Sequence, residues 1–218
     1  MNFKKFKKLE NTDTLFLHVC IPHTKNFKKS VLQLIKKFKP EIVVIHSTIS
    51  PNTTSSLQSV CDIPIMYSAT RGVHKRMLTD LKRYTKYFAI SKNAPKKKMA
   101  ITEFKKSMKL CNVKTKQMEK PETLELAKII CDTSYYGWLI NYAQISKIIT
   151  EKENVDYDEM WKFSDEIHKI LKNRPKMFPG FIGGHCVIPN LELINDNSLN
   201  QISTINDIFK KFNDSKSS

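Results

Sequence analysis

The residues with the clearest capacity for chemistry form a glycine-rich loop that contains a cysteine. The chain has five glycines, and three of them fall in the segment Pro179-Gly180-Phe181-Ile182-Gly183-Gly184-His185-Cys186. Glycine permits positive φ and the close approach of another molecule, and a cysteine thiolate is a strong nucleophile. The pattern predicts a backbone that adopts positive φ or lies close to another group at these glycines, with Cys186 as a candidate nucleophile. An ordinary tight loop with a buried, inert cysteine is the alternative for this segment taken alone.

An α/β layer over residues 1–119 precedes the helices and the loop. Its apolar runs predict strands at 14–22, 42–48, 64–68, 87–90 and 113–118. Helical spacing predicts helices at 3–10, 25–39, 53–60, 75–86 and 96–110. Strands that alternate with helices and are apolar on both faces are typical of a parallel sheet covered on both sides. The fold class is therefore α/β, with a partial Rossmann-like parallel sheet that includes no Gly-x-Gly-x-x-Gly after any strand.

The pattern becomes wholly helical after Pro121. Apolar residues at helical spacing predict one long helix over 122–151, with a kink at Gly137, and a second over 157–171 capped by Asn154 or Asp156. We therefore expect an all-α domain at 120–190 with a long central helix, followed by a polar C-terminal helix and tail at 191–218.

The order of these segments resembles that of the nucleotide-sugar 6-dehydrogenases, the UDP-glucose/GDP-mannose dehydrogenase family. The matching segments are a strand ending in Cys20-Ile21-Pro22, a strand followed by His46-Ser47-Thr48, a helix with Glu125-Leu126-Ala127-Lys128, and the loop 179–189. The Gly-Gly-His-Cys form of the loop looks most like the members that oxidise UDP-N-acetylhexosamines. The resemblance extends from near residue 12 to residue 190.

The resemblance implies that the C6 alcohol of a UDP-sugar is oxidised to the acid through a cysteine thioester, with NAD as the cofactor. Cys186 matches the nucleophile and Lys128 matches the lysine that stabilises the oxyanion, which agrees with the need for a cation at the developing charge. Asp132 and Asn190 stand at two further catalytic positions. The remaining matches are binding positions, for the substrate Gly183, Gly184 and His185, and for the cofactor Pro22, Ser47 and Thr48.

Two catalytic positions depart from the family pattern. The family has Asn four residues after the lysine and Asp four residues after the cysteine, whereas this chain has Asp132 and Asn190. If both side chains face one pocket, the pair survives with its positions exchanged; otherwise Asp132 places a negative charge beside the oxyanion. The resemblance also implies a first βαβαβ with the pyrophosphate-binding glycines before residue 1, and a C-terminal nucleotide-sugar domain after residue 190.

The composition indicates the class of protein, its location and whether it binds a membrane or a metal. The 218 residues are 40% hydrophobic and 27% charged, as in globular proteins. No apolar run reaches the ~20 residues of a membrane span, so we expect no membrane association. The five cysteines, an odd number without regular spacing, predict a reducing and hence cytoplasmic location. His and Cys residues lack zinc-like spacing, so no metal site is predicted.

The net charge and the apolar helix at 122–151 indicate which partners to expect. The net charge is +16, but only four of the 37 basic residues are Arg and the lysines are spread along the chain, which does not favour nucleic acid. The helix at 122–151 is apolar on more than one face and predicts a homodimer; a nucleotide sugar is the expected substrate. Two functions remain open. The cysteine loop favours a nucleotide-sugar dehydrogenase, whether complete, incomplete or degenerate. The absent glycine fingerprint favours a non-catalytic dimeric binding or scaffold protein derived from that family.

Overall fold

The computed structural model describes residues 13–184, 187–194 and 196–216 and divides the chain into two compact units, Met1–Lys128 and Ile129–Ser218. The helix predicted at 3–10 lies outside the described residues. The division falls later than the expected boundary between 119 and 120, because helix α5 (Pro121–Ala127) packs on α2 and on strands of the first unit. The C-terminal helix belongs to the second unit.

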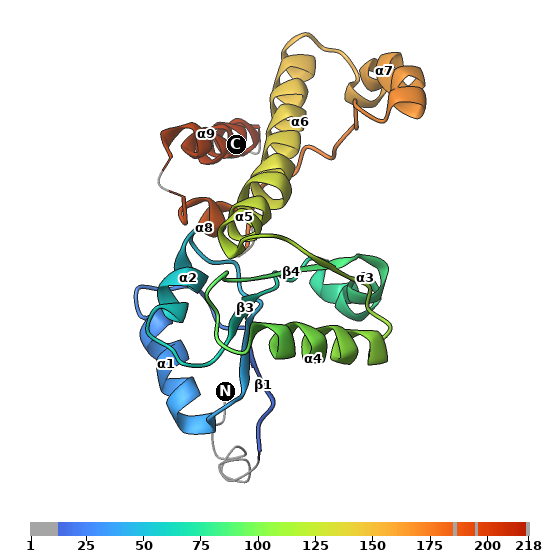
Figure 1. Ribbon diagram of the computed structural model, residues 1–218. Coiled ribbons are helices and arrows are strands. Elements are labelled where there is room, and N and C mark those ends of the chain that lie inside the picture. The colour runs from blue at the N-terminus through green and yellow to red at the C-terminus, as the bar shows by residue number, and fades with distance from the viewer. Residues whose placement is uncertain (1–12, 185–186, 195, 217–218) are drawn as a thin grey trace. The chain divides into compact units, whose positions relative to one another are not determined.

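Unit 1 is built on a five-stranded sheet (Figure 1). In order across the sheet the strands are β1 (Phe16–Val19), β2 (Ile42–Ile45), β3 (Ile65–Tyr67), β4 (Lys86–Ile90) and β5 (Thr115–Gln117). The α/β prediction is confirmed, but the expectation of a fully parallel sheet is wrong at one pairing, since β4 runs antiparallel to β3. A strand that is buried on both faces looks the same in either direction, so its sequence pattern does not reveal this reversal.

Helices cover both faces of the sheet, as expected. On one face, α1 (Phe27–Phe38), α2 (Thr53–Gln58) and α5 pack against Val43 and Ile45. On the other, α4 (Lys97–Leu110) packs against Ile42 and Val44. The short helix α3 (Met77–Arg83) follows a 3₁₀ turn at His74–Arg76 and connects β3 to β4.

The first strand differs from its prediction. The run 14–22 was expected to be buried on both faces, but in β1 only Val19 is buried and His18 is exposed. Within the described part of the chain β1 pairs only with β2. It therefore forms an edge of the sheet, where side chains have fewer neighbours.

Unit 2 consists of helices. They are α6 (Tyr135–Lys152), α7 (Tyr157–Leu171), α8 (Ile188–Leu191) and α9 (Asn197–Asp214), and α6 packs against both α7 and α9. The prediction for 157–171 is confirmed, and Asp156 caps this helix by accepting a hydrogen bond from Glu159 N at 2.7 Å. No helix among the described residues has both the length and the apolar character needed to cross a membrane.

The predicted helix over 122–151 is interrupted, but not at Gly137. A π-helical segment, Lys128–Ser134, separates α5 from α6. Gly137 serves packing instead, because a Cβ at that position would lie 3.1 Å from methyl groups of both Ile202 and Val187. Glycine here allows α6 to approach α8 and α9 closely.

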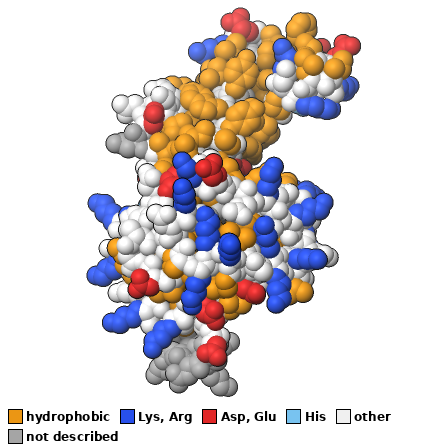
Figure 2. Space-filling view, viewed as in Figure 1, with side chains coloured by type: hydrophobic (Ala, Val, Ile, Leu, Met, Phe, Trp, Pro, Cys, Tyr) orange, Lys and Arg blue, Asp and Glu red, His pale blue; other side chains and the backbone are white. Residues whose placement is uncertain are grey.

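Helix α6 buries several polar side chains and exposes several apolar ones. Its buried side chains include Asn141, Gln144 and Thr150, whereas Tyr142 and Ile149 are exposed by 63% and 53%. Figure 2 shows hydrophobic side chains gathered over this part of the molecule, on α6 and the neighbouring α7. Exposed apolar surface of this kind marks an interaction site in soluble proteins.

Candidate functional site

The cysteine loop is described up to Gly184 and again from Val187, because His185 and Cys186 lie outside the described residues. Gly184 has φ +77°, in the left-handed region that favours glycine, and nothing lies within 4 Å of the position of a Cβ there. Val187 leads directly into α8. The structure therefore describes the loop on both sides of this pair, up to Gly184 and from Val187.

The N-terminal end of the loop is held by the amide of Asn206 on α9. Asn206 Oδ1 accepts hydrogen bonds from Ile182 N at 2.7 Å and from Gln144 Nε2 at 2.9 Å. Its Nδ2 donates to Ile182 O at 3.1 Å. One buried side chain thus satisfies both backbone groups of Ile182, which fixes the position of this residue.

A second amide extends this anchor to α6. Gln144 Nε2 also donates to Gly180 O at 2.8 Å, and Gln144 Oε1 accepts from Asn141 Nδ2 at 2.8 Å. Sequence reasoning missed these three residues. A signal for two of them, Asn141 and Gln144, is the spacing of two amides three residues apart in one helix, which places both on one face.

Apolar contacts complete the support of the loop. Ile182 and Val187, on either side of the undescribed pair, both belong to one buried cluster with Leu191 and Ile202. The two loop ends are therefore fixed in the same core by side chains from α8 and α9.

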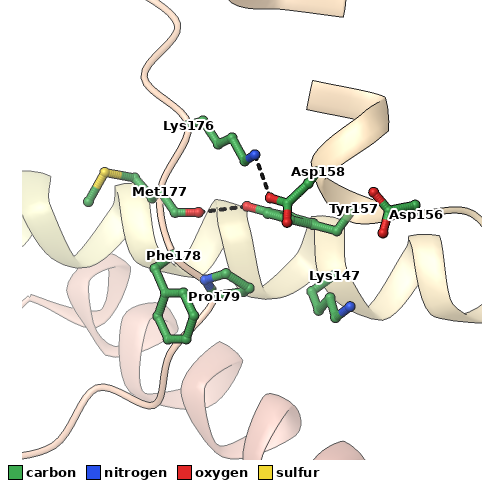
Figure 3. Close-up of a pocket in the computed structure, with 8 residues that line it drawn as sticks. All are labelled: Lys147, Asp156, Tyr157, Asp158, Lys176, Met177, Phe178 and Pro179. Carbon is green, nitrogen blue, oxygen red and sulfur yellow. Dashed lines mark hydrogen bonds and ion pairs between the residues drawn. The ribbon is translucent and has the colours of Figure 1, made fainter. Parts of the chain in front are cut away.

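A cavity of about 360 Å³ lies beside the segment that leads into the loop (Figure 3). Its lining comes from α6, from the start of α7 and from residues 176–179. Tyr157 donates its hydroxyl proton to Met177 O at 2.7 Å, and Lys176 pairs with Asp158 at 2.5 Å, which lowers the pKa of Asp158. Because these groups satisfy one another, they fasten the segment to α7 and leave no evident reactive group in the cavity.

The residues predicted beside Cys186 are distributed over both units. Half-buried Lys128 ends unit 1, whereas Asp132, which is exposed, and Asn190 belong to unit 2. Lys128 and Asp132 lie in the π-helical segment, an irregularity that is frequent at functional sites. Their catalytic roles stay predictions.

The predicted cofactor positions meet at the carboxyl edge of the sheet. Ser47 follows β2, and its hydroxyl donates to Ile21 O at 2.6 Å, next to the exposed Pro22. Thr48, which is half-buried, continues the same turn. The structure therefore brings these residues together at the edge where open α/β sheets bind ligands.

The described residues do not fit a complete NAD. The turn from β1 to α1 contains no glycine, and Asn26 at the start of α1 makes no side-chain cap. A dinucleotide pyrophosphate needs close backbone approach at a helix N-terminus, which this turn does not offer. Within the same described residues, no group of three or more His, Cys, Asp or Glu side chains is placed to hold a metal ion.

No family model matches the chain, and no curated protein matches it either. Solved structures share its fold. A UDP-D-ManNAc dehydrogenase from Pyrococcus horikoshii superposes with a TM-score of 0.74 at 15% identity, covering 94% of this chain and 53% of that protein. An NDP-N-acetyl-D-galactosaminuronic acid dehydrogenase from Methanosarcina mazei Go1 gives 0.68 at 14% identity, covering 94% and 50%.

A different dehydrogenase has a similar fold. The 3-hydroxyisobutyrate dehydrogenase of Mycobacterium tuberculosis gives a TM-score of 0.62 at 13% identity and covers 94% of this chain and 75% of that one. At these identities the likeness establishes the Rossmann-like fold. The chain spans about half the length of the two nucleotide-sugar dehydrogenases.

Proposed function

We propose that the chain is the substrate-handling part of a nucleotide-sugar 6-dehydrogenase, acting on a UDP-linked N-acetylhexosamine. The observation that carries the proposal is the loop Pro179–Cys186, whose described part is anchored at Gly180 and Ile182 by buried amides. The fold shared with nucleotide-sugar dehydrogenases supports the same assignment. The four described cysteines are free thiols, in keeping with a cytoplasmic location.

The chemistry assigned to this chain is the addition of Cys186 to an aldehyde at C6 of the sugar. A sulfur–carbon bond forms as the carbonyl π bond breaks, and the electron pair moves to the carbonyl oxygen. Lys128 is assigned to stabilise this oxyanion, and Asp132 and Asn190 are assigned as the other two catalytic residues. Gly183, Gly184 and His185 contact the sugar. The hydride-accepting NAD requires a dinucleotide-binding fold beyond the residues described, with Pro22, Ser47 and Thr48 at its border.

We further propose that two copies associate through the exposed apolar face of α6 and α7. This face includes Tyr142, Ile149 and Phe163, the last of which is 91% exposed. The buried polar side chains of α6, among them Asn141 and Gln144, point into unit 2, which leaves its exposed apolar side chains for a partner. Burial of such side chains stabilises association by ~25 cal/mol per Å² of apolar surface, before the cost of association is subtracted.

Protection of Cys186 from alkylation tests the enzymatic proposal. Iodoacetamide is applied at neutral pH with and without UDP-N-acetylglucosamine, and each cysteine is mapped by mass spectrometry. We expect the ligand to slow modification of Cys186 several-fold and to leave Cys111, an exposed thiol of unit 1, unchanged. Without ligand, Lys128→Ala should slow the alkylation of Cys186, because loss of a nearby cation raises the pKa of a thiol.

Lys152→Ala, which removes an exposed lysine from the end of α6, is the matched control. The alkylation rate of Cys20 is measured separately from that of Cys111. The predicted buried strand 14–22 includes Cys20, but this residue follows β1 and is exposed, and partial desolvation nevertheless raises the pKa of its thiol. Equal rates for Cys186 and Cys111, unaffected by ligand and by Lys128→Ala, would contradict an assembled catalytic loop.

A non-catalytic dimeric scaffold is the second candidate function. The observation in its favour is the absence of a glycine-rich turn between β1 and α1. If the protein is such a scaffold, two copies still associate through the apolar face of α6 and α7, but UDP-N-acetylglucosamine leaves the alkylation rate of every cysteine unchanged.

A further inference from the structure

The carboxyl edge of the sheet in unit 1 gathers basic side chains from several strand ends. His18 lies in β1, His46 follows β2 and Arg71 follows β3. Because β4 runs antiparallel to β3, its first residue, Lys86, reaches the same edge. The reversal of β4 therefore adds an ammonium group to the edge at which open α/β sheets bind ligands.

Hydrogen bonds fix these groups around one carbonyl oxygen. Ser68 O accepts from His46 Nδ1 at 2.7 Å and from Lys86 Nζ at 3.1 Å. Since a carbonyl can only accept, His46 carries its proton on Nδ1, and its Nε2 accepts from His18 Nδ1 at 2.9 Å. Burial lowers the pKa of His46 to about 3 and, with the charge of Lys86, also lowers that of His18. Both imidazoles are therefore neutral at pH 7.

Among the described residues, the positive charge of Lys86 has no counterion. Lys86 is 8% exposed, and its hydrogen bonds go to the neutral carbonyls of Ser68 and Ala69. No carboxylate among the described residues pairs with it. Burial, together with the charge of Arg71, lowers the pKa of Lys86 to about 8, so it is still mostly protonated at pH 7. A nearly buried ammonium without a counterion is energetically costly.

Arg71 supplies a second fixed cation. Its guanidinium donates to Thr85 O at 2.6 Å and lies over the rings of Tyr84 and Tyr87, 5.7 and 5.3 Å from their centroids. The remaining titratable group that acts on Lys86 is Cys20, which is neutral at pH 7 because its pKa is raised. The described groups that act on the charge of Lys86 are therefore a second cation, Arg71, and a neutral thiol, with no carboxylate among them.

We propose that this edge binds a small oxyanion, a phosphate or carboxylate group, beside Lys86 and Arg71, with access past the exposed His18 and Cys20. Such a ligand would provide the counterion that Lys86 lacks, through charge-assisted hydrogen bonds. The site lies entirely in unit 1 and does not depend on the proposed dehydrogenase function.

Histidine NMR spectra during anion titration test the proposal. Sulfate, whose charge is constant between pH 6 and 9, represents a phosphate group, and acetate represents a carboxylate; ionic strength is held with sodium chloride. We expect saturable shifts of the His18 ring signals with at least one of the two anions and none of His168, which lies in unit 2. Lys86→Met should weaken this binding about tenfold, the value of one charge-assisted hydrogen bond.

Lys92→Met is the matched control, because Lys92 is exposed and follows the other end of β4. It should change the affinity less than twofold. If Lys86→Met does not fold, two other measurements test the proposal. Arg71→Met should weaken anion binding, and the affinity of the wild-type protein for the anion should fall between pH 7 and 9 as Lys86 loses its proton. Shifts that do not saturate, or equal weakening by Lys86→Met and Lys92→Met, would mean only diffuse attraction to a basic surface and would overturn the proposal.

Discussion

At the scale of single residues, the amide of Asn206 determines how firmly the cysteine loop is held. Asn206→Ala removes the acceptor for Ile182 N and for one N–H of Gln144. Each buried donor without a partner costs ~1–3 kcal/mol, so the loss of the acceptor for two donors should lower the free energy of unfolding of unit 2 by ~2–6 kcal/mol. Urea denaturation followed by tryptophan fluorescence measures this, because both tryptophans, Trp138 and Trp161, lie in unit 2.

The control for this variant is Asn200→Ala on the same helix. Asn200 is exposed, so its truncation should change the unfolding free energy of unit 2 by less than ~0.5 kcal/mol. If Asn206→Ala were as mild as Asn200→Ala, the hydrogen bonds to the loop would contribute little to its position.

At the scale of elements, a buried carboxyl group joins α5 to α2. Glu125 is fully buried, and its Oε1 accepts from Thr54 N at 2.9 Å and from Thr54 Oγ1 at 2.6 Å. It thereby satisfies an N-terminal amide of α2, which a helix cannot satisfy itself. Its other oxygen, Oε2, is buried and has no hydrogen-bond partner in the part of the chain that the structure describes. This contact fixes α5, and with it the start of the segment that carries Lys128, on the sheet of unit 1.

The titration of Glu125 predicts a pH dependence of unit 1. Burial raises the pKa of Glu125 more than its hydrogen bonds lower it. The native state then keeps this proton to a higher pH than the unfolded state does, so its contribution to stability falls as the pH rises through that interval. We expect the protection of the Thr54 amide from hydrogen exchange, corrected for intrinsic rate, to fall from pH 4.5 to 7 in the wild-type protein.

Glu125→Gln should remove most of this fall, since the amide does not titrate. Glu103→Gln, on α4 at the opposite face of the sheet, should leave it in place. The reverse trend, a Thr54 amide that becomes better protected with rising pH, would show that the hydrogen bonds to the carboxylate outweigh the cost of its burial.

At the scale of the whole molecule, the exposed apolar face of α6 and α7 predicts self-association. We expect sedimentation velocity at tens of micromolar to show a dimer, and Tyr142→Lys with Ile149→Lys to convert it to a monomer, because a charge inside an apolar interface is costly to desolvate. Leu110→Lys is the control: Leu110 is 82% exposed but lies in unit 1. A wild-type protein that sediments as a monomer over this range would refute the pairing.

The elements that the sequence predicts best are those whose determinants are local. Helix α7 begins and ends at the predicted residues, because its apolar spacing and the cap at Asp156 lie within the segment itself. Strand β2 is buried throughout, as its unbroken apolar run indicates. The loop 179–186 was likewise recognisable, because glycines are scarce in this chain and cluster there.

Tertiary structure alone decided the features that depend on residues far apart in the chain. The direction of β4 depends on how residues 68–85 return to the sheet, and that direction moves Lys86 to the edge with His18 and His46. The hydrogen bond between Asn206 and Ile182 joins residues 24 positions apart in the sequence, and the hydrogen bond between Asn206 and Gln144 joins residues 62 positions apart. Apolar periodicity reports which face of an element is covered, but not which distant side chain covers it. The sequence by itself therefore determined the elements and the cysteine loop, whereas the polar contacts that hold that loop, and the cations gathered at the sheet edge, arose only when the elements packed.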